Sequence, residues 1–182
     1  MNKILFLLVA LVTWHISSCQ KKDSKIDSGY GNGPRTNVSA ALQGNWMYGQ
    51  FSMTEYWAQN PADYIGNAFQ MAIAFKFNSN GTYEQYFTSS TVTGGVVSYH
   101  RSVTKGTVEV DEASKTIITH ANTAHYKKTM NGQTTEDRDL TKSEITAVTR
   151  YMYEMKTESN GTKAIYLKMN PTENALQFIQ KF

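Results

Sequence analysis

Three histidines and a short charged run are the side chains in this chain best suited to metal or acid–base chemistry. His100, His120 and His125 lack the pairwise spacing of a metal site, and no cysteine lies near them. His120 and His125 are an odd number of residues apart, so on one extended strand they would face opposite sides. The run Glu136-Asp137-Arg138-Asp139 is typical of a solvated strand face. The chain also lacks a Gly-x-Ser-x-Gly elbow and a phosphate-binding loop, so we expect no metal, no cofactor and no catalytic centre.

Arg101 stands among aromatic residues that recur at alternating positions of the predicted strands. If the odd positions of these strands face inward, Arg101 and Gln85 are polar residues in an otherwise apolar lining. A buried guanidinium needs a partner, which the carboxylate of an amphipathic ligand would supply. The alternative is a bulge near Gly94-Gly95 that shifts the register by one residue and turns Arg101 outward. The predicted ligand-binding residues are Tyr83, Gln85, Phe87, Tyr99, Arg101, Tyr151 and Tyr153.

The single cysteine, Cys19, follows a segment with the features of an export signal. Lys3 precedes an apolar run over residues 4–16, and two serines precede the cysteine. A positive start, a short apolar core and small residues before a cut point mark a secretory signal, which we assign to residues 1–18. The apolar run is shorter than the roughly 20 residues that a membrane-spanning helix needs. One cysteine also excludes an internal disulfide.

The tetrapeptide Ile16-Ser17-Ser18-Cys19 resembles the lipobox of bacterial lipoproteins. The resemblance implies that the Cys19 thiol receives a diacylglyceryl group, that the signal is cut before Cys19, and that the new amine is acylated, for example with palmitate. It also implies a protein anchored in the cell envelope, at the outer membrane and facing either the periplasm or the exterior. The alternative is an ordinary signal followed by a coincidental cysteine.

Residues 19–36 are predicted to be a flexible tether between the anchor and a single domain over residues 37–182. The tether is rich in charges and glycine and has one aliphatic residue, so it cannot bury enough surface to order itself. The formal net charge of +3 is too small to indicate a nucleic-acid partner, because such proteins usually carry a concentrated basic stripe.

The domain shows period-two alternation interrupted by turn signals. Residues 69–77 are apolar at every odd position, Asn80-Gly81 marks a turn, and residues 83–88 alternate again, which predicts a hairpin. Gly94-Gly95, Asn131-Gly132 and Asn160-Gly161 punctuate later runs in the same way. With an early strand at residues 46–53, the pattern predicts an all-β antiparallel meander of eight to ten strands. Closure into a barrel would remove exposed edges, and a β-sandwich is the alternative.

Gly44-Asn45-Trp46 resembles the Gly-x-Trp motif that opens the first strand of lipocalins. The irregular aromatic segment 54–68 stands where lipocalins carry a loop over the barrel mouth, which implies lid residues Trp57 and Tyr64. The Thr-Asp-Tyr pattern of typical lipocalins is absent, and Arg150 and Lys168 are both candidates for the basic residue that packs on the tryptophan. The chain is most similar in pattern to the small lipocalin-like lipoproteins of Bacteroidota.

These features predict a lipid-anchored, lipocalin-like barrel that binds a small apolar or amphipathic ligand. The alternative is a non-catalytic accessory lipoprotein that contacts a protein partner in an outer-membrane complex. An enzyme is a third class, and we find no residue pattern that favours it.

Overall fold

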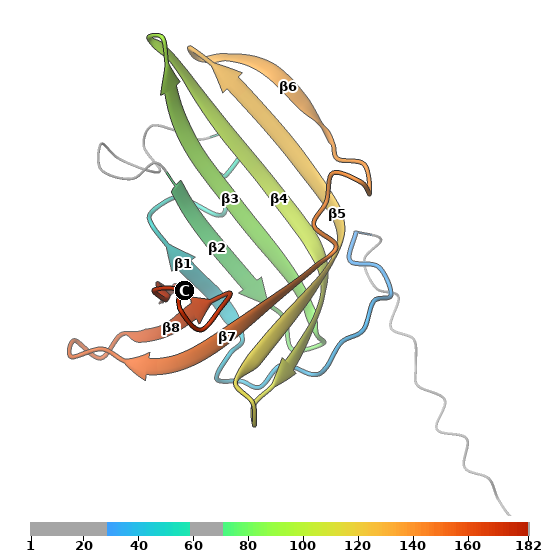
Figure 1. Cartoon of the computed structure of the whole chain (residues 1–182), viewed down its shortest axis with the longest axis vertical. Helices are drawn as coiled ribbons and strands as arrows, with labels where there is room; N and C mark the ends of the chain where they lie inside the picture. Colours follow the sequence, from blue (N-terminus) through green and yellow to red (C-terminus); the bar gives the residue numbers. More distant parts are fainter. Residues whose placement is uncertain (1–28, 59–70, 182) are drawn as a thin grey trace, which may run out of the picture.

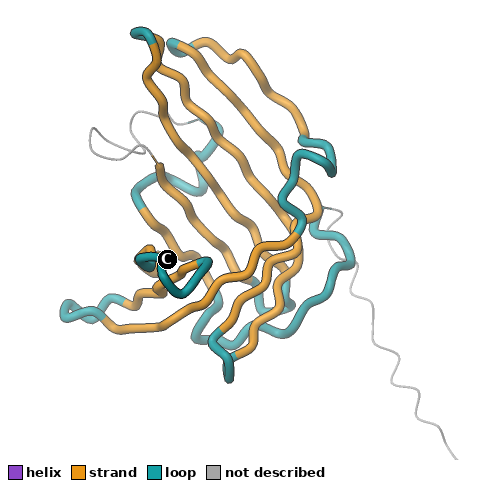
Figure 2. Tube along the Cα trace, in the orientation of Figure 1, coloured by secondary structure: helices purple, strands orange, loops and turns teal. Residues whose placement is uncertain are grey.

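The computed structural model describes residues 29–58 and 71–181, and within them the chain is all-β (Figures 1 and 2). The predicted signal of residues 1–18, Cys19 and Tyr64 lie outside the described residues. In this described part, the structure contains no helix long and apolar enough to cross a membrane. The strands are β1 (Gly44–Tyr48), β2 (Met71–Phe77), β3 (Thr82–Thr93), β4 (Val96–Asp111), β5 (Thr116–Met130), β6 (Gln133–Asp139), β7 (Val148–Thr157), β8 (Lys163–Lys168) and β9 (Leu176–Lys181).

The strands pair antiparallel in one nine-stranded sheet whose hydrogen bonds form a ring. β1 pairs with both β2 and β9, and β4 pairs with β5, which also pairs with β7. Strand β6 pairs with the second half of β5 and lies beside the ring. In Figure 1 the long strands β3, β4 and β5 form a tall wall, and β7 crosses its lower half. The predicted all-β antiparallel meander of eight to ten strands is confirmed.

The turn between β3 and β4 decides which residues of β4 face the interior of the ring. Gly94 and Gly95 both have positive φ, 58° and 79°, and connect Thr93 directly to its pairing partner Val96. A two-residue turn of this kind suits the twist of a hairpin. It also places odd-numbered residues of β3 opposite even-numbered residues of β4, as in the pairing of Gln85 with Thr104. The inward face therefore changes from odd positions on β3 to even positions on β4.

A bulge between β4 and β5 shifts the face again. Lys105 pairs with Thr123 and Gly106 pairs with Ala121, so one extra residue of β5, Asn122, stands at the register shift. The bulge places His120 and His125 on the same outer side of the sheet, contrary to the expectation from their odd spacing. Gly106 is required here, because a Cβ atom at this position would collide with the backbone carbonyl of His120.

The interior of the ring contains the larger of two hydrophobic clusters. It includes Trp46, which is fully buried and donates a hydrogen bond from Nε1 to the Leu42 carbonyl at 2.8 Å. Trp46 is therefore a core residue. Phe75 and Phe77 from β2 stack in parallel beside it with ring centroids 5.5 Å apart. Other members of this inner cluster are Val38, Leu42, Tyr83, Val108, Ile117, Tyr153, Ile165, Leu167 and Phe178.

The second cluster covers the outer face of β1 to β4. Residues 51–56 turn back over this face, where Phe51 and Tyr56 pack on Ala72, Ala74 and Val103. The hydroxyl group of Tyr56 donates a hydrogen bond to the Phe87 carbonyl and accepts one from the Ser102 amide. This segment is therefore attached to the pair β3–β4 by both apolar contact and backbone hydrogen bonds.

The segment 29–36, which the sequence assigns to the tether, lies along the outer face of β4 and β5. The amide of Thr36 donates to the Val108 carbonyl at 3.1 Å, and its hydroxyl accepts from the Val110 amide at 2.8 Å. Tyr30 is buried and donates a hydrogen bond to the Glu84 carboxylate. Residues 29–36 thus pack on the domain, because polar residues can order themselves by pairing with the edges and side chains of an existing sheet.

Candidate ligand-binding cavity

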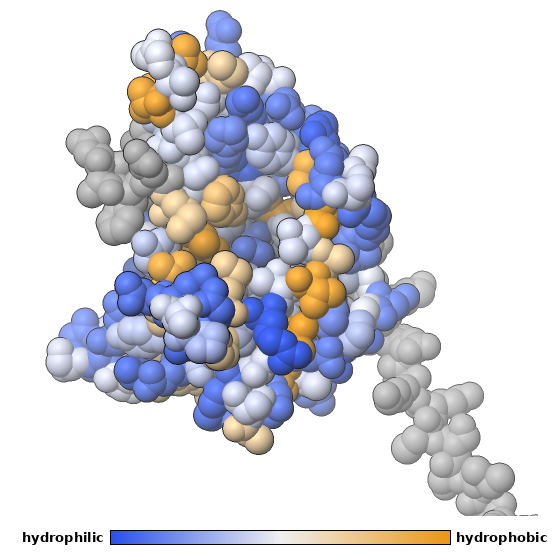
Figure 3. Space-filling view, in the orientation of Figure 1, coloured by the Kyte–Doolittle hydropathy of each residue, from blue (hydrophilic) through white to orange (hydrophobic). Residues whose placement is uncertain are grey.

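A cavity of about 620 Å³ lies inside the ring. Its aromatic and aliphatic lining comes from strands on all sides of the ring, so no single hairpin forms it. In Figure 3 the hydrophobic residues are visible within the hollow of the molecule, surrounded by polar residues. The principal apolar lining residues are Ile73, Phe75, Tyr83, Phe87, Ala121, Ala124, Tyr151, Leu167, Leu176 and Phe178.

The polar groups inside the cavity are neutral side chains. Tyr83 hydrogen-bonds to the Thr119 side chain, and Gln85 stands beside its cross-strand partner Thr104. Burial raises the pKa of Tyr83 above its usual value, which outweighs the opposing effect of the Thr119 hydrogen bond. Burial likewise raises the pKa of Tyr151. Both phenols therefore stay protonated at neutral pH and can offer a hydrogen bond without a charge.

Four of the seven predicted ligand-binding residues line the cavity: Tyr83, Gln85, Phe87 and Tyr151. Tyr153 is a buried member of the inner cluster but does not line the cavity. Its ring lies 5.6 Å from the Lys115 ammonium group. Alternation along β3 was sufficient to find Tyr83, Gln85 and Phe87. The turn between β2 and β3 pairs odd positions with odd positions, as in Phe77 with Tyr83, so the inward face has the same parity on both strands.

Tyr99 and Arg101 do not line the cavity, which corrects the assumption that odd positions of β4 face inward. Both lie on the outer face, because the two-residue turn at Gly94-Gly95 pairs odd positions of β3 with even positions of β4. The alternative derived from the sequence explained an outward Arg101 by a bulge at these glycines, and the turn has the same effect without a bulge. Arg101 is nevertheless only 3% exposed. Its Nη1 atom donates to the carbonyl oxygens of Tyr56 at 3.3 Å and Trp57 at 3.2 Å. Arg101 therefore fastens the segment 51–57 to the sheet.

Trp57 also lies on the outer face, so it does not cover the cavity as the predicted lid would. Its ring meets the His125 ring edge-on at 5.1 Å, and the Arg101 guanidinium lies 6.0 Å from its centroid. It lines a second hollow of about 530 Å³ on the outer side of β4 and β5, together with Lys105 and Asn122. The other predicted lid residue, Tyr64, lies outside the described residues.

The mouth of the cavity contains charged and exposed apolar residues that the alternation did not identify. Glu144 borders it on the loop before β7, Arg150 on β7, Lys168 at the end of β8 and Glu173 on the segment that follows β8. Val148 and Met169 also line it and are 55% and 60% exposed. These residues come from loops and strand ends, where period-two reasoning does not apply.

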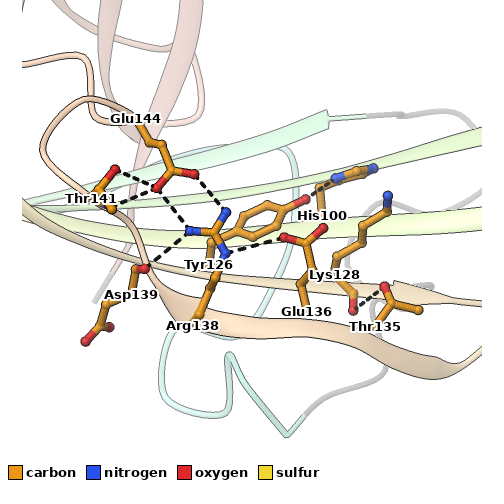
Figure 4. Close-up of polar contacts among 9 residues, drawn as sticks. All are labelled: His100, Tyr126, Lys128, Thr135, Glu136, Arg138, Asp139, Thr141 and Glu144. Carbon is orange, nitrogen blue, oxygen red and sulfur yellow. Dashed lines mark hydrogen bonds and ion pairs between the residues drawn. The ribbon is translucent and has the colours of Figure 1, made fainter.

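The loop between β6 and β7 is held by a polar network (Figure 4). Arg138 binds Glu144 with two hydrogen bonds, of 3.0 Å from Nη1 and 2.8 Å from Nη2. Thr141 donates to the same carboxylate from its amide and its hydroxyl, both at 2.8 Å. These bonds, with Arg138 contributing most, lower the pKa of Glu144 to about 2. This border of the mouth is thus a fixed loop whose carboxylate is paired.

The three described histidines bind neighbouring side chains. His100 Nδ1 lies 2.6 Å from the Tyr126 hydroxyl, and His120 Nε2 lies 2.6 Å from a Glu109 carboxylate oxygen. His125 binds both Asp137 and Asp139 at 2.8 Å. Among the described residues, no group of three or more histidine, cysteine, aspartate or glutamate side chains is arranged to hold a metal ion.

No protein-family model matches this chain, and no curated protein is detectably similar to it in sequence. The geometry of the cavity and the residues around it are therefore the basis for assigning a function.

Proposed function

We propose that this protein is held in the cell envelope by lipid on Cys19 and binds a small apolar or amphipathic ligand inside its ring of strands. The observation that carries this proposal is the cavity of about 620 Å³ with its aromatic and aliphatic lining. Ligand sites in proteins are typically hollows of about 300–1,000 Å³, mostly apolar, with a few polar groups that orient the ligand.

The lining indicates how such a ligand would be oriented. Tyr83, Gln85 and Thr104 offer uncharged hydrogen-bonding groups inside the cavity, whereas Arg150 and Lys168 lie at its mouth. Placing a charged group among uncharged, largely apolar residues is costly, so a charged end of the ligand belongs at the mouth. We therefore favour a molecule with an apolar body, at most a neutral polar group inside, and any formal charge outside.

Two sequence motifs and the pairing of the strands support the envelope location and the lipocalin-like character within this proposal. The lipobox-like tetrapeptide ends at Cys19, the Gly-x-Trp motif places Trp46 on β1, and the strands pair in a ring of hydrogen bonds. A barrel that keeps its centre partly unfilled is the arrangement that lipocalins use to hold one small ligand.

Native mass spectrometry of the full-length protein, extracted gently from its own host, tests the proposal. A mass excess that is present under native conditions and lost on denaturation would be a carried ligand. Acyl groups on Cys19 would remain on the denatured chain, so one experiment separates the anchor from the cargo. A protein that carries nothing and takes up none of a panel of fatty acids, isoprenoids and sterol-like molecules would overturn the binding function.

A cavity-filling variant gives the matched control. Ala121→Phe adds a ring at a position that lines the cavity, whereas Val92→Phe adds the same ring at a site on β3 that is 67% exposed. We expect Ala121→Phe to abolish ligand uptake and Val92→Phe to leave it unchanged. Thermal unfolding of both variants shows whether a loss of uptake reflects a loss of fold.

A second candidate function, an accessory lipoprotein that binds another envelope protein, is favoured by the placement of Trp57. This tryptophan is 37% exposed yet held by Arg101 and His125 on the outer face. Exposed but immobilised tryptophans are frequent anchors of protein interfaces. Crosslinking in the host followed by purification tests it: loss of a specific crosslinked partner in Trp57→Ala would support this function, and an unchanged pattern would contradict it.

A further inference from the structure

We propose that the mouth of the cavity docks on the surface of the lipid bilayer, so that the ligand passes directly between membrane and cavity. This inference rests on the proposed lipid anchor and ligand cavity. It adds an orientation for the anchored domain and a membrane surface as the partner of one set of residues.

The first observation is where the chain enters the folded part. The Gly29 carbonyl accepts a hydrogen bond from Asn122 Nδ2 at 3.0 Å, and Asn122 Oδ1 accepts one from the Lys142 ammonium at 2.9 Å. Lys142 belongs to the loop between β6 and β7, which borders the mouth through Glu144 and Ile145. The start of the described chain is therefore joined to the mouth loop through a single side chain, that of Asn122.

The second observation is the length of chain available between that point and the anchor. Cys19 and Gly29 are ten residues apart, and ten residues can span at most about 35 Å even when fully extended. Because residues 29–36 pack on the domain, the free length is shorter than the sequence division at residue 36 suggested. A lipid on Cys19 would thus keep the Asn122–Lys142 side of the domain, and with it the mouth, close to the bilayer.

The third observation is the exposed apolar surface at the mouth. Among the described residues, four large hydrophobic side chains are exposed: Trp57, Val92, Val148 and Met169. Two of them, Val148 at the start of β7 and Met169 directly after β8, line the mouth. Apolar side chains around the opening of a ligand cavity can enter the headgroup region and shorten the aqueous path of an apolar ligand.

The charges at the mouth are compatible with an anionic membrane surface. Arg138 pairs with Glu144, which offsets that carboxylate, and leaves Arg150 and Lys168 against Glu173. Arg150 and Lys168 can contact such a surface, because basic residues beside a membrane are attracted to anionic lipid headgroups.

Site-specific fluorescence in vesicles tests the docking. The full-length lipidated protein is placed in vesicles of phosphatidylglycerol and phosphatidylethanolamine that contain a lipid with a nitroxide on its headgroup. An environment-sensitive fluorophore is attached to cysteine in three variants: Val148→Cys, Met169→Cys and the control Val92→Cys. All three sites are exposed, so the substitutions are compatible with the fold. We expect several-fold stronger quenching at positions 148 and 169 than at position 92.

The unsubstituted protein separates the possible failures. Its only cysteine is Cys19, so a lipidated chain takes up no label. Labelling of Cys19 would show that the anchor is absent, and both the anchor proposal and this inference would fall. A blocked Cys19 with no quenching at the mouth, or with equal quenching at position 92, would overturn the docking alone.

A transfer measurement adds a functional readout. The double variant Val148→Glu/Met169→Glu places carboxylates at the mouth without touching the neutral groups inside the cavity. At equal ligand occupancy, measured by native mass spectrometry, we expect it to transfer a fluorescent fatty acid to the same vesicles several-fold more slowly. An unchanged transfer rate would contradict docking of the mouth.

Discussion

The hydroxyl group of Tyr30 donates a hydrogen bond to the carboxylate of Glu84, a residue 54 positions later in the chain. Both residues are buried on the outer face of the sheet, and Tyr86 donates a second hydrogen bond to the same carboxylate at 2.5 Å. Burial by itself would raise the pKa of Glu84, but the hydrogen bonds from Tyr30 and Tyr86 together with Lys76 and Lys105 hold that pKa below its usual value. The contact attaches the chain that leads from Cys19 to the domain.

Removing this contact should destabilise the domain. Tyr30→Phe deletes one donor to a buried carboxylate, and we expect the free energy of unfolding to fall by about 1–3 kcal/mol. Tyr166→Phe is the matched control, because it deletes a tyrosine–glutamate hydrogen bond of 2.8 Å, to Glu158, at the molecular surface. Urea-induced unfolding measures both. Equal losses in the two variants would show that residues 29–36 contribute nothing special to stability.

The pH dependence of stability should have a component from His125. Burial tends to lower the pKa of His125, but the hydrogen bonds from its ring to Asp139 and Asp137 raise it above the usual 6.5. A raised pKa in the folded state gives stability that is fully present below pH 6.5 and is lost as the pH rises through the folded value. We expect His125→Gln to flatten this loss, measured as melting temperature against pH.

His100 provides the control for that pH profile. Burial, with a smaller contribution from Lys128, lowers the pKa of His100, so its effect on stability has the opposite sign. His100→Gln should therefore leave the loss above pH 6.5 in place. If His100→Gln removed that loss and His125→Gln did not, the assignment to the Asp137–His125–Asp139 contact would be wrong.

Arg101 should matter for stability and not for ligand binding. Arg101→Met keeps much of the side-chain volume but deletes the donors to the Tyr56 and Trp57 carbonyl oxygens, and we expect a loss of about 1–3 kcal/mol. Because Arg101 lies on the outer face, ligand affinity measured by titration should be unchanged. Gln85→Leu, which alters the cavity lining, should show the reverse pattern. Loss of affinity with intact stability in Arg101→Met would restore the original interpretation of this residue.

Gly106 should tolerate no side chain. In Gly106→Ala the added methyl group meets the His120 carbonyl across the β4–β5 pair, and we expect a loss of about 3 kcal/mol, the upper end of the range for overpacking. In Gly161→Ala no atom lies within 4 Å of the new methyl group, and the cost is the strain of φ 81°, about 1 kcal/mol. Thermal and denaturant unfolding measure the difference. A harmless Gly106→Ala would mean that the two strands separate easily at the bulge.

The strands and most of their turns could be predicted from the sequence, because their signals are local. Alternation over residues 69–77 and the Asn80-Gly81 turn report directly on backbone geometry, and these features place Tyr83, Gln85 and Phe87 on one face. The Gly-x-Trp motif likewise indicates the first strand, β1, on which the buried Trp46 lies. Short-range periodicity determines which residues share a face of a strand.

Only the tertiary structure decided which face of β4 and β5 is the inner one and which segments cover the outer face. The turn at Gly94-Gly95 and the extra residue Asn122 each reverse the parity, and a shift of one residue moves every following side chain to the other face. The segments that cover the outer face are held by contacts between residues far apart in the chain, such as Tyr30 with Glu84 and Arg101 with Trp57. A polar segment has no periodicity that records such a partner, because its order comes from hydrogen bonds that exist only after the ring of strands has formed.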